Sequence, residues 1–207
     1  PFSLIWNDGP RMQAISKMLE DKGLAPKEPG KGQNVWYCIG YVNARAKADS
    51  IALHDCDILT YDRMLLARLF YPIANPNYQF EFCKGFYARI SDGKMNGRAS
   101  RLLVSPLLLA MEQVIGHCDY LSFMKSFRYP LAGEFSFRRS LIPELRISSD
   151  WGLEVGMLSE MHRNQASNRI CQIDIADTYE HKHQELSEDD RDFGLSRMSI
   201  DIVKVLI

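Results

Sequence analysis

The chain has 207 residues, of which 25 are lysine or arginine and 26 are aspartate or glutamate, so its formal net charge is −1. This balance excludes a general electrostatic preference for nucleic acid or for an anionic membrane surface. No apolar run approaches the roughly 20 residues that a membrane-spanning helix needs, and the length suits one domain. The five cysteines are scattered without a Cys-x-x-Cys pair, which indicates reduced thiols and a cytoplasmic protein.

Periodicity, turn residues and capping signals predict strands that alternate with helices along the chain. Strands separated by helices indicate a layered α/β domain with a largely parallel sheet. The expected elements, in chain order, are a strand at 2–6, helices at 11–21 and 33–47, a strand that ends at the aspartates 55 and 57, a helix at 61–70, a half-buried strand at 80–90, a helix at 98–114 that Pro106 kinks or breaks, a short strand and helix at 134–145, a helix at 151–164, a strand at 171–176 and a helix at 188–206.

Two aspartates, Asp55 and Asp57, come at the end of an apolar run that begins at Ile51. A buried strand would deliver them to the carboxyl edge of the sheet, where open α/β sheets bind ligands. Carboxylate oxygens suit hard divalent cations, so the pair predicts a metal site that also holds a diphosphate. The pattern Asp-x-Asp is frequent, and a plain strand end with a solvated turn is the alternative.

Two segments predict anion sites. Lys31 lies between two glycines, so that the backbone and the ammonium group could both approach an anion closely, although a flexible turn explains the pattern as well. Arg98 and Ser100 open a predicted helix, and a helix N-terminus with an arginine and a hydroxyl group can bind a phosphate or a carboxylate. Ordinary capping by Asn96 is the alternative for the second segment.

Two acids lie within apolar stretches, Glu154 at a helix start and Glu134 beside a glycine. Acids in such places are rarely buried without a partner, so we expect each to face a ligand or a cation, with structural pairing to an arginine as the alternative.

Two histidines, His181 and His183, follow the last predicted strand. One of them could complete the metal site, whereas a place on the surface is the more common meaning of such a pair.

Seven segments, taken in order, resemble the glucosyl-3-phosphoglycerate synthases, which are retaining glycosyltransferases of the GT-A fold. The segments are 30–32, 55–57, 84–87, 97–100, 130–134, 151–156 and 181–183. The resemblance implies one GT-A domain over residues 1–207, an α/β domain with a mixed, mostly parallel sheet flanked by helices. The chain starts at Pro1 without a methionine, and the family's first strand, which contacts the nucleotide base, has no counterpart here. We therefore expect that an amino-terminal portion is missing and that this chain alone binds the donor poorly.

The resemblance also implies roles for residues at the donor. Asp55 and Asp57 match the motif that holds Mg²⁺ or Mn²⁺ against the diphosphate of a nucleotide sugar, and His181 matches a histidine that reaches the same metal. Lys31 matches a catalytic lysine near the diphosphate and the sugar. Glu154 matches the acid beside the transferred sugar, also at a catalytic position.

Further residues are implied at the acceptor and at the nucleotide. Arg98 and Ser100 match the segment that grips the acceptor's phosphate and carboxylate, with serine in place of the family's threonine. The implied substrate-binding set also includes Gly97, Ala99 and Glu134. Asp8, in the turn after the first predicted strand, is a candidate nucleotide contact. The role of His183 is open, because the family tends to have asparagine at that position.

The implied reaction moves glucose from an NDP-glucose, with UDP-glucose favoured, to 3-phosphoglycerate. Retention requires either a carboxylate nucleophile, for which Glu154 and Glu134 are the candidates, or attack from the same face as the leaving diphosphate. No two acids are paired at an obvious spacing, which favours same-face attack.

Several alternatives stay open at this point. They are a mannosyl donor, glycerate as the acceptor, a non-catalytic nucleotide-sugar-binding module, and a purely structural interaction domain. An apolar stripe through Leu195, Met198, Ile202 and Val205 on the last predicted helix suggests a homodimer, or alternatively a helix that closes the core.

Overall fold

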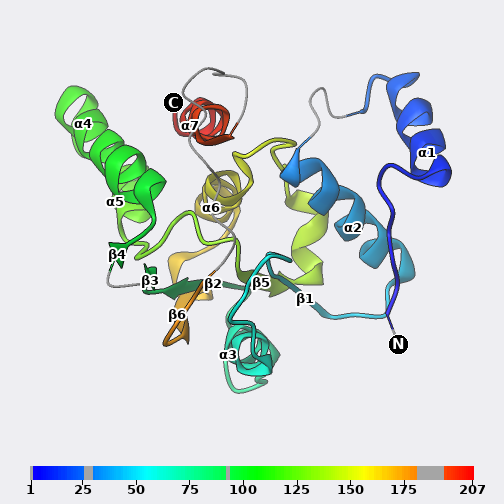
Figure 1. The fold of residues 1–207 in the computed structure, drawn as a ribbon, viewed down its shortest axis with the longest axis horizontal. Coiled ribbons are helices and arrows are strands. Elements are labelled where there is room, and N and C mark those ends of the chain that lie inside the picture. The colour runs from blue at the N-terminus through cyan, green and yellow to red at the C-terminus, as the bar shows by residue number, and fades with distance from the viewer. Residues whose placement is uncertain (1, 26–29, 92–93, 181–193) are drawn as a thin grey trace.

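The protein is seen in a computed structural model that describes residues 2–25, 30–91, 94–180 and 194–207. At its centre is a four-stranded sheet in the order β1 (Ser50–Leu53), β5 (Phe135–Arg138), β2 (Phe82–Tyr87) and β6 (Ile170–Ala176) (Figure 1). β5 pairs antiparallel with both β1 and β2, and β2 pairs parallel with β6. Three strands therefore point one way and β5 points the other, which confirms the predicted mixed sheet.

The reversed direction of β5 decides what gathers at one edge of the sheet. Leu53 at the end of β1 is in register with Phe135 at the start of β5, and Phe135 is also in register with Lys84 of β2. The residues just after β1 and just before β5 therefore meet at the same edge, where β2 and β6 also end. This edge receives both Asp55 and Glu134.

One face of the sheet is covered by α3 (Arg63–Ala74), which contacts all four strands (Figure 1). The helix begins where the Asp62 side chain accepts a hydrogen bond from the backbone N–H of Met64, as an N-cap does. Its residues Leu65, Leu69 and Ile73 recur every four positions and are buried against the sheet. The predicted helix at 61–70 is confirmed, with a start two residues later and an end four residues later.

The other face carries the larger core, in which helices pack on a row of aromatic side chains. Phe82, Phe135 and Phe137 are fully buried there, and the rings of Phe82 and Phe135 stack at 5.8 Å. The helices that contribute include α4 (Ser105–Ile115), α5 (Asp119–Lys125), α6 (Leu153–Asn164) and α7 (Gly194–Leu206), and α2 (Lys31–Arg45) adds Ile39. Because helices cover both faces, β2 is buried on both, and the predicted half-buried strand is wrong in this respect.

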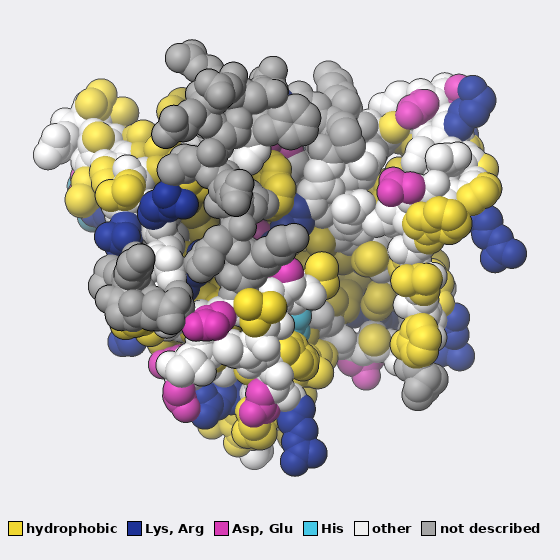
Figure 2. Space-filling view, in the orientation of Figure 1, with side chains coloured by type: hydrophobic (Ala, Val, Ile, Leu, Met, Phe, Trp, Pro, Cys, Tyr) yellow, Lys and Arg dark blue, Asp and Glu magenta, His cyan; other side chains and the backbone are white. Residues whose placement is uncertain are grey.

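α1 (Pro10–Glu20) and α2 (Lys31–Arg45) confirm the two helices predicted near the start of the chain. The predicted strand at 2–6 is wrong, because these residues pair with no strand in the described part of the chain. Phe2 is 95% exposed and Trp6 is 66% exposed, so apolar composition there does not reflect burial. Figure 2 shows hydrophobic side chains on the surface around this stretch and α1.

A short hairpin of β3 (Ile90–Ser91) and β4 (Lys94–Met95) precedes a helix that starts at Arg98. That helix passes through a π-helical turn, η1 (Ser100–Val104), before it continues as α4. Pro106 is the second residue of α4 and has no N–H for an α-helical hydrogen bond back into the wide turn. The irregularity predicted there is confirmed as a change of helix type.

The remaining elements are two 3₁₀ helices, η2 (Arg139–Glu144) and η3 (Ser167–Arg169), of which η2 follows β5 as the predicted short helix does. No helix in the described ranges combines the length and the apolar character that a bilayer crossing requires.

Candidate active site

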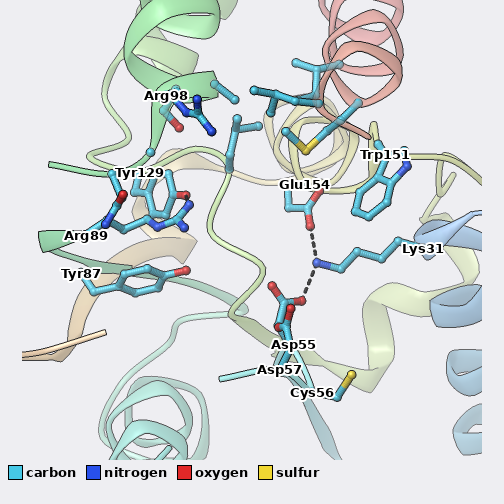
Figure 3. Close-up of a pocket in the computed structure, with 18 residues that line it drawn as sticks. Lys31, Asp55, Cys56, Asp57, Tyr87, Arg89, Arg98, Tyr129, Trp151 and Glu154 are labelled. Carbon is cyan, nitrogen blue, oxygen red and sulfur yellow. Dashed lines mark hydrogen bonds and ion pairs between the residues drawn. The ribbon is translucent and has the colours of Figure 1, made fainter. Parts of the chain in front are cut away.

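A cavity of about 480 Å³ opens at the edge of the sheet where β1 and β2 end (Figure 3). Its wall combines acids, bases and aromatic rings from segments far apart in the sequence. The charged residues of the wall are Lys31, Asp55, Asp57, Arg89, Arg98 and Glu154. The structure thus brings together most of the residues that the sequence singled out.

Lys31 lies between two acids at one side of the cavity (Figure 3). Its Nζ is 2.5 Å from Oδ1 of Asp55 and 2.7 Å from Oε1 of Glu154. Burial alone would lower the pKa of Lys31, but the charges of Glu154 and Asp55 outweigh burial and raise it above its ordinary value. The lysine therefore stays charged and holds the two carboxylates together. The expectation that Glu154 faces a ligand or a cation is confirmed, with the lysine as the cation.

The glycines beside Lys31 allow α2 to begin against the backbone of residues 148–150. Gln33 donates its backbone N–H to the Ser149 carbonyl at 2.8 Å, and a Cβ on Gly32 would collide with the Ser148 carbonyl oxygen. Lys31 is the first residue of α2, so the alternative of a flexible turn is wrong at this residue. This packing of the start of α2 against residues 148–150 fixes the backbone of Lys31, and the lysine side chain extends into the cavity.

Asp55 and Asp57 follow β1 and both line the cavity, as the strand-end prediction requires. Gly133 packs against Asp55 so closely that a Cβ on Gly133 would lie 2.5 Å from Oδ2 of Asp55. Two carboxylates on one wall fit a Mg²⁺ or Mn²⁺ ion, which proteins often bind through one or two carboxylates and the phosphates of a substrate. Among the described residues, no group of three histidine, cysteine or acidic side chains stands ready as a metal site. The predicted third ligand, His181, lies outside them, as does His183.

The opposite wall is basic and polar. Gly97 has a φ of +80°, a conformation that glycine adopts without strain, and the chain turns there into the helix that carries Arg98 and Ser100. Ser100 is buried on the cavity wall, and its hydroxyl group has no hydrogen-bond partner among the described residues. A buried hydroxyl group of this kind suits an acceptor atom of a ligand. Ala99 also lines this wall.

Arg89 is a wall residue that the sequence analysis did not identify. It lies two residues beyond the end of β2, and its guanidinium group donates a hydrogen bond of 2.9 Å to the Tyr129 hydroxyl group. The only feature of the sequence that could have indicated a role for Arg89 in the site is its position just after a strand. With Arg98, it gives the cavity two guanidinium groups (Figure 3).

Glu134 lies behind the wall and does not line the cavity, since it is 0% exposed. Its carboxylate accepts hydrogen bonds from the hydroxyl groups of Tyr87, at 2.8 Å, and Tyr179, at 2.7 Å. Burial raises its pKa, the charge of Asp55 adds to that effect, and the two tyrosines oppose it. The alternative of pairing with an arginine is wrong, because tyrosines hold this acid.

Lys84 is a second group that sequence reasoning left without a role. It is 1% exposed, and its Nζ donates a hydrogen bond of 2.5 Å to the carbonyl oxygen of Ala132. Burial lowers its pKa to about 8, against the opposing effect of Glu154 and Glu134. The bond holds the segment that leads to Gly133 and so supports the wall beneath Asp55.

The structure does not bring Asp8 to the cavity. Asp8 lies just before α1 and lines a separate surface hollow with Asn34 and Tyr37. The structure therefore gives no support to the predicted nucleotide contact at Asp8.

The C-terminal helix α7 closes one side of the cavity. Leu195, Met198 and Ile202 line it, and Ile202 is also buried in the larger core. The stripe predicted on this helix therefore serves the chain's own core and cavity, which confirms the core-closing alternative.

The mixed sheet with helices on both faces and a cavity at its edge has the GT-A fold, as a comparison with solved structures shows. A crystal structure of glucosyl-3-phosphoglycerate synthase from Mycobacterium tuberculosis, in complex with Mn²⁺, UDP-glucose and phosphoglyceric acid, matches with a TM-score of 0.66 and 23% identity over 91% of this chain and 57% of that chain. This match shows the fold. No protein-family model matches the chain.

Two curated relatives are more similar in sequence, and both are glucosyl-3-phosphoglycerate synthases. The protein from Persephonella marina is 49% identical and that from Methanococcoides burtonii is 43% identical, each over 98% of this chain and 50% of the relative. The predicted resemblance is thus confirmed: the chain is a homologue of the glucosyl-3-phosphoglycerate synthases. It spans about half the length of the curated relatives it matches.

Proposed function

We propose that the chain is the part of a glucosyl-3-phosphoglycerate synthase that transfers glucose, with retention, from UDP-glucose to 3-phosphoglycerate in the presence of Mg²⁺ or Mn²⁺. The observation that carries this proposal is the division of the cavity into an acidic wall bridged by Lys31 and an opposite wall with two guanidinium groups. Such a cavity suits a metal diphosphate on one side and a small anionic acceptor on the other.

On the donor side, Asp55 and Asp57 would hold the divalent ion, with His181 as a further proposed ligand. The bound ion would stabilise negative charge on the departing diphosphate. Lys31 supplies a fixed positive charge at the same wall, and Glu154, held by that lysine, offers its carboxylate to the sugar hydroxyl groups. The acidic wall thus binds and orients the donor without a proton transfer.

On the acceptor side, Arg98 and the hydroxyl group of Ser100 would bind the phosphate of 3-phosphoglycerate. Gly97 and Ala99 leave room for the ligand to approach the backbone of this segment. Arg89, fixed by Tyr129, provides a second charge that suits the carboxylate. Two separate guanidinium groups favour an acceptor with two anionic ends over an uncharged one.

The position of the acids also bears on how retention is achieved. Glu134 has no exposed surface, so it cannot reach a sugar carbon, and Glu154 is the one acid left from the two candidates for a nucleophile. Glu154 is already paired with Lys31, which suits an orienting role. We therefore propose same-face attack, in which the leaving diphosphate accepts the proton of the acceptor hydroxyl group.

The first test is sugar transfer with and without a chelator. We expect glucosyl-3-phosphoglycerate to form from UDP-glucose and 3-phosphoglycerate, to stop when EDTA removes the metal, and to resume with added Mn²⁺ or Mg²⁺, because the two aspartates act only through the ion. Product is measured by chromatography with a panel of nucleotide sugars, including a mannosyl donor, and of acceptors, including glycerate. Transfer that persists in EDTA would refute the metal site.

Replacing Arg98 with alanine should raise KM for 3-phosphoglycerate by about tenfold to a hundredfold, since a charged hydrogen bond is lost. The variant should also lose its preference for 3-phosphoglycerate over glycerate, whereas KM for UDP-glucose should stay near that of the wild type. Arg101, which is exposed and off the cavity wall, is the matched control for an Arg→Ala change nearby. An unchanged acceptor preference in Arg98→Ala would contradict the assignment.

One alternative has an observation in its favour. The same cavity, with Lys31 between two acids at one wall, would also suit a nucleotide-sugar-binding module without turnover. Calorimetry with UDP and Mn²⁺ separates the two proposals, since tight binding with no product in the assay above supports the module.

The remaining proposals concern the cellular location, the oligomeric state and the domain organisation of the protein. A cytoplasmic location is supported by five cysteines, all of them free. A homodimer is supported by Ile200 of α7 and by Ile207, the residue after the helix, which are 45% and 82% exposed. Light scattering of the purified chain tests the dimer. We also propose that residues 1–207 form one GT-A domain.

A further inference from the structure

A polar cluster reaches from the cavity wall, which Tyr87 lines, to the buried residues Glu134 and Tyr179 behind it. It consists of Glu134, Tyr87 and Tyr179, and we refer to it as the Glu134 cluster. The two tyrosine rings stack with centroids 3.5 Å apart and planes 11° apart, and each donates its hydroxyl group to a different oxygen of the carboxylate. Tyr87 is 7% exposed and Tyr179 is 2% exposed.

The cluster is joined to the proposed metal ligand. The backbone N–H of Asp55 points to Oε1 of Glu134 at 3.5 Å, the same oxygen that accepts from Tyr179. Gly133, the residue before Glu134, packs against the carboxylate of Asp55. A shift of Glu134 would therefore move both the backbone and the side-chain surroundings of Asp55.

The cluster is also joined to the acceptor wall. The ring of Tyr87 meets the ring of Tyr129 edge to face, with centroids 5.3 Å apart, and the Tyr129 hydroxyl group accepts from Arg89. A continuous series of contacts thus runs from Asp55 through Glu134 and Tyr87 to Arg89. It connects the two walls of the cavity, with Tyr87 and Tyr129 on the cavity wall between them and Glu134 behind it.

The alternative is that Glu134 has only a structural role, as a buried acid whose carboxylate oxygens accept hydrogen bonds from its neighbours. Burying a carboxylate is costly without hydrogen bonds, and an apolar side chain would fill the space without that cost. The carboxylate differs from an apolar side chain in that it orients its neighbours through directional hydrogen bonds. Its donors come from the segment after β1, from β2 and from the segment after β6. Three separate segments are thereby fixed to one another at the edge where the ligand would bind.

We propose that Glu134 is a positioning residue: it fixes the Asp55 segment in the orientation that binds the divalent ion, and Tyr179 fixes Glu134. The inference rests on the proposed function, because it assumes that Asp55 binds a metal. It assigns Glu134 no contact with the substrate, in contrast to the substrate-binding role that the resemblance implies. Groups that orient a metal ligand typically change metal affinity by about 10- to 100-fold when they are removed.

The test is Mn²⁺ binding in the presence of UDP, measured by calorimetry on the chain and on two variants. Tyr179→Phe removes one hydroxyl group and keeps the stacked ring. Tyr120→Phe is the matched control, because its hydroxyl group makes a part-buried bond of 2.9 Å to Ser159 away from the cavity. We expect Tyr179→Phe to weaken Mn²⁺ binding about tenfold or more and Tyr120→Phe to leave it within about twofold. Tyr179→Phe should lower the melting temperature more than Tyr120→Phe, because it takes a hydrogen bond from a buried carboxylate.

The outcomes separate this inference from the proposed function. If Tyr179→Phe binds Mn²⁺ as tightly as the wild type, Glu134 does not position Asp55 and the inference is overturned, while the proposed function stands. If the wild type binds neither Mn²⁺ nor UDP, the proposed function fails and the inference falls with it. Glu134→Gln gives an independent check, since it keeps the size of the side chain and loses one acceptor oxygen. It should weaken Mn²⁺ binding at least as much as Tyr179→Phe does.

Discussion

Replacing Lys31 with methionine should lower kcat for glucosyl transfer by about 100- to 1,000-fold, the loss typical of removing one fixed group that stabilises charge in a transition state. The ammonium group lies within hydrogen-bond distance of both Asp55 and Glu154, so the change also leaves two carboxylates facing each other without a cation. Their repulsion should disturb the acidic wall as well. Initial rates at saturating UDP-glucose and 3-phosphoglycerate measure the effect.

Lys125→Met is the matched control for this experiment. Lys125 is paired with Glu112 at 2.5 Å, and its side chain is 28% exposed, close to the 24% of Lys31. It lies outside the cavity, so its removal should change stability slightly and kcat hardly at all. A kcat for Lys31→Met within about tenfold of the wild type would show that the lysine has no part in charge stabilisation.

A single methyl group at Gly133 is the second change with a large expected effect. The Cβ of alanine would lie 2.5 Å from Oδ2 and 2.6 Å from Oδ1 of Asp55, so the carboxylate must move. A displacement of about 1 Å at a positioned group can cost about 100-fold in rate, and we expect a loss of that size in Gly133→Ala. Higher Mn²⁺ should recover part of the activity, because the damage is to metal binding.

Gly40→Ala tests whether adding a methyl group to any glycine has this effect. Gly40 lies inside α2, and a Cβ there would meet no heavy atom within 4 Å. Alanine favours a helix interior over glycine by about 0.5 to 1 kcal/mol, so this variant should melt slightly higher and keep its rate. If Gly133→Ala keeps wild-type activity and metal dependence, the contact with Asp55 is not important for function.

The helices were the most predictable part of the fold, since periodic apolar residues and caps are local signals. The predicted helix at 151–164 differs from α6 only in starting two residues earlier. Strands were harder to predict because a short apolar run does not reveal its neighbours. Residues 2–6 look like a strand but are exposed, and nothing local shows that β5 runs against its partners or that β2 is covered on both faces.

The candidate site was predictable where residues carry charge at strand and helix ends. Lys31 lies 24 positions before Asp55 and 123 before Glu154, so their convergence could be inferred only through the resemblance to a family. The roles of Tyr87 and Tyr179 could not be predicted. Tyr87 stands in a segment that carries the resemblance, but a tyrosine in an apolar stretch looks like an ordinary core residue. Their importance depends on Glu134, whose complete burial the sequence does not reveal.

The wide π-helical turn at η1 makes the spacing of its segment as consequential as its composition. An α-helix advances about 100° per residue, and a π turn holds one residue more than an α turn does. Deleting one residue between Ser100 and Val104 would let a regular helix run through to α4 with Arg98 on nearly the same side, because the wide turn holds its extra residue within a single turn. An inserted residue or a second deletion would instead rotate Arg98 by about 100° around the helix axis. Acceptor choice in this protein should thus tolerate the loss of one residue here and respond to an insertion or to a second deletion, even where every side chain on the cavity wall is retained.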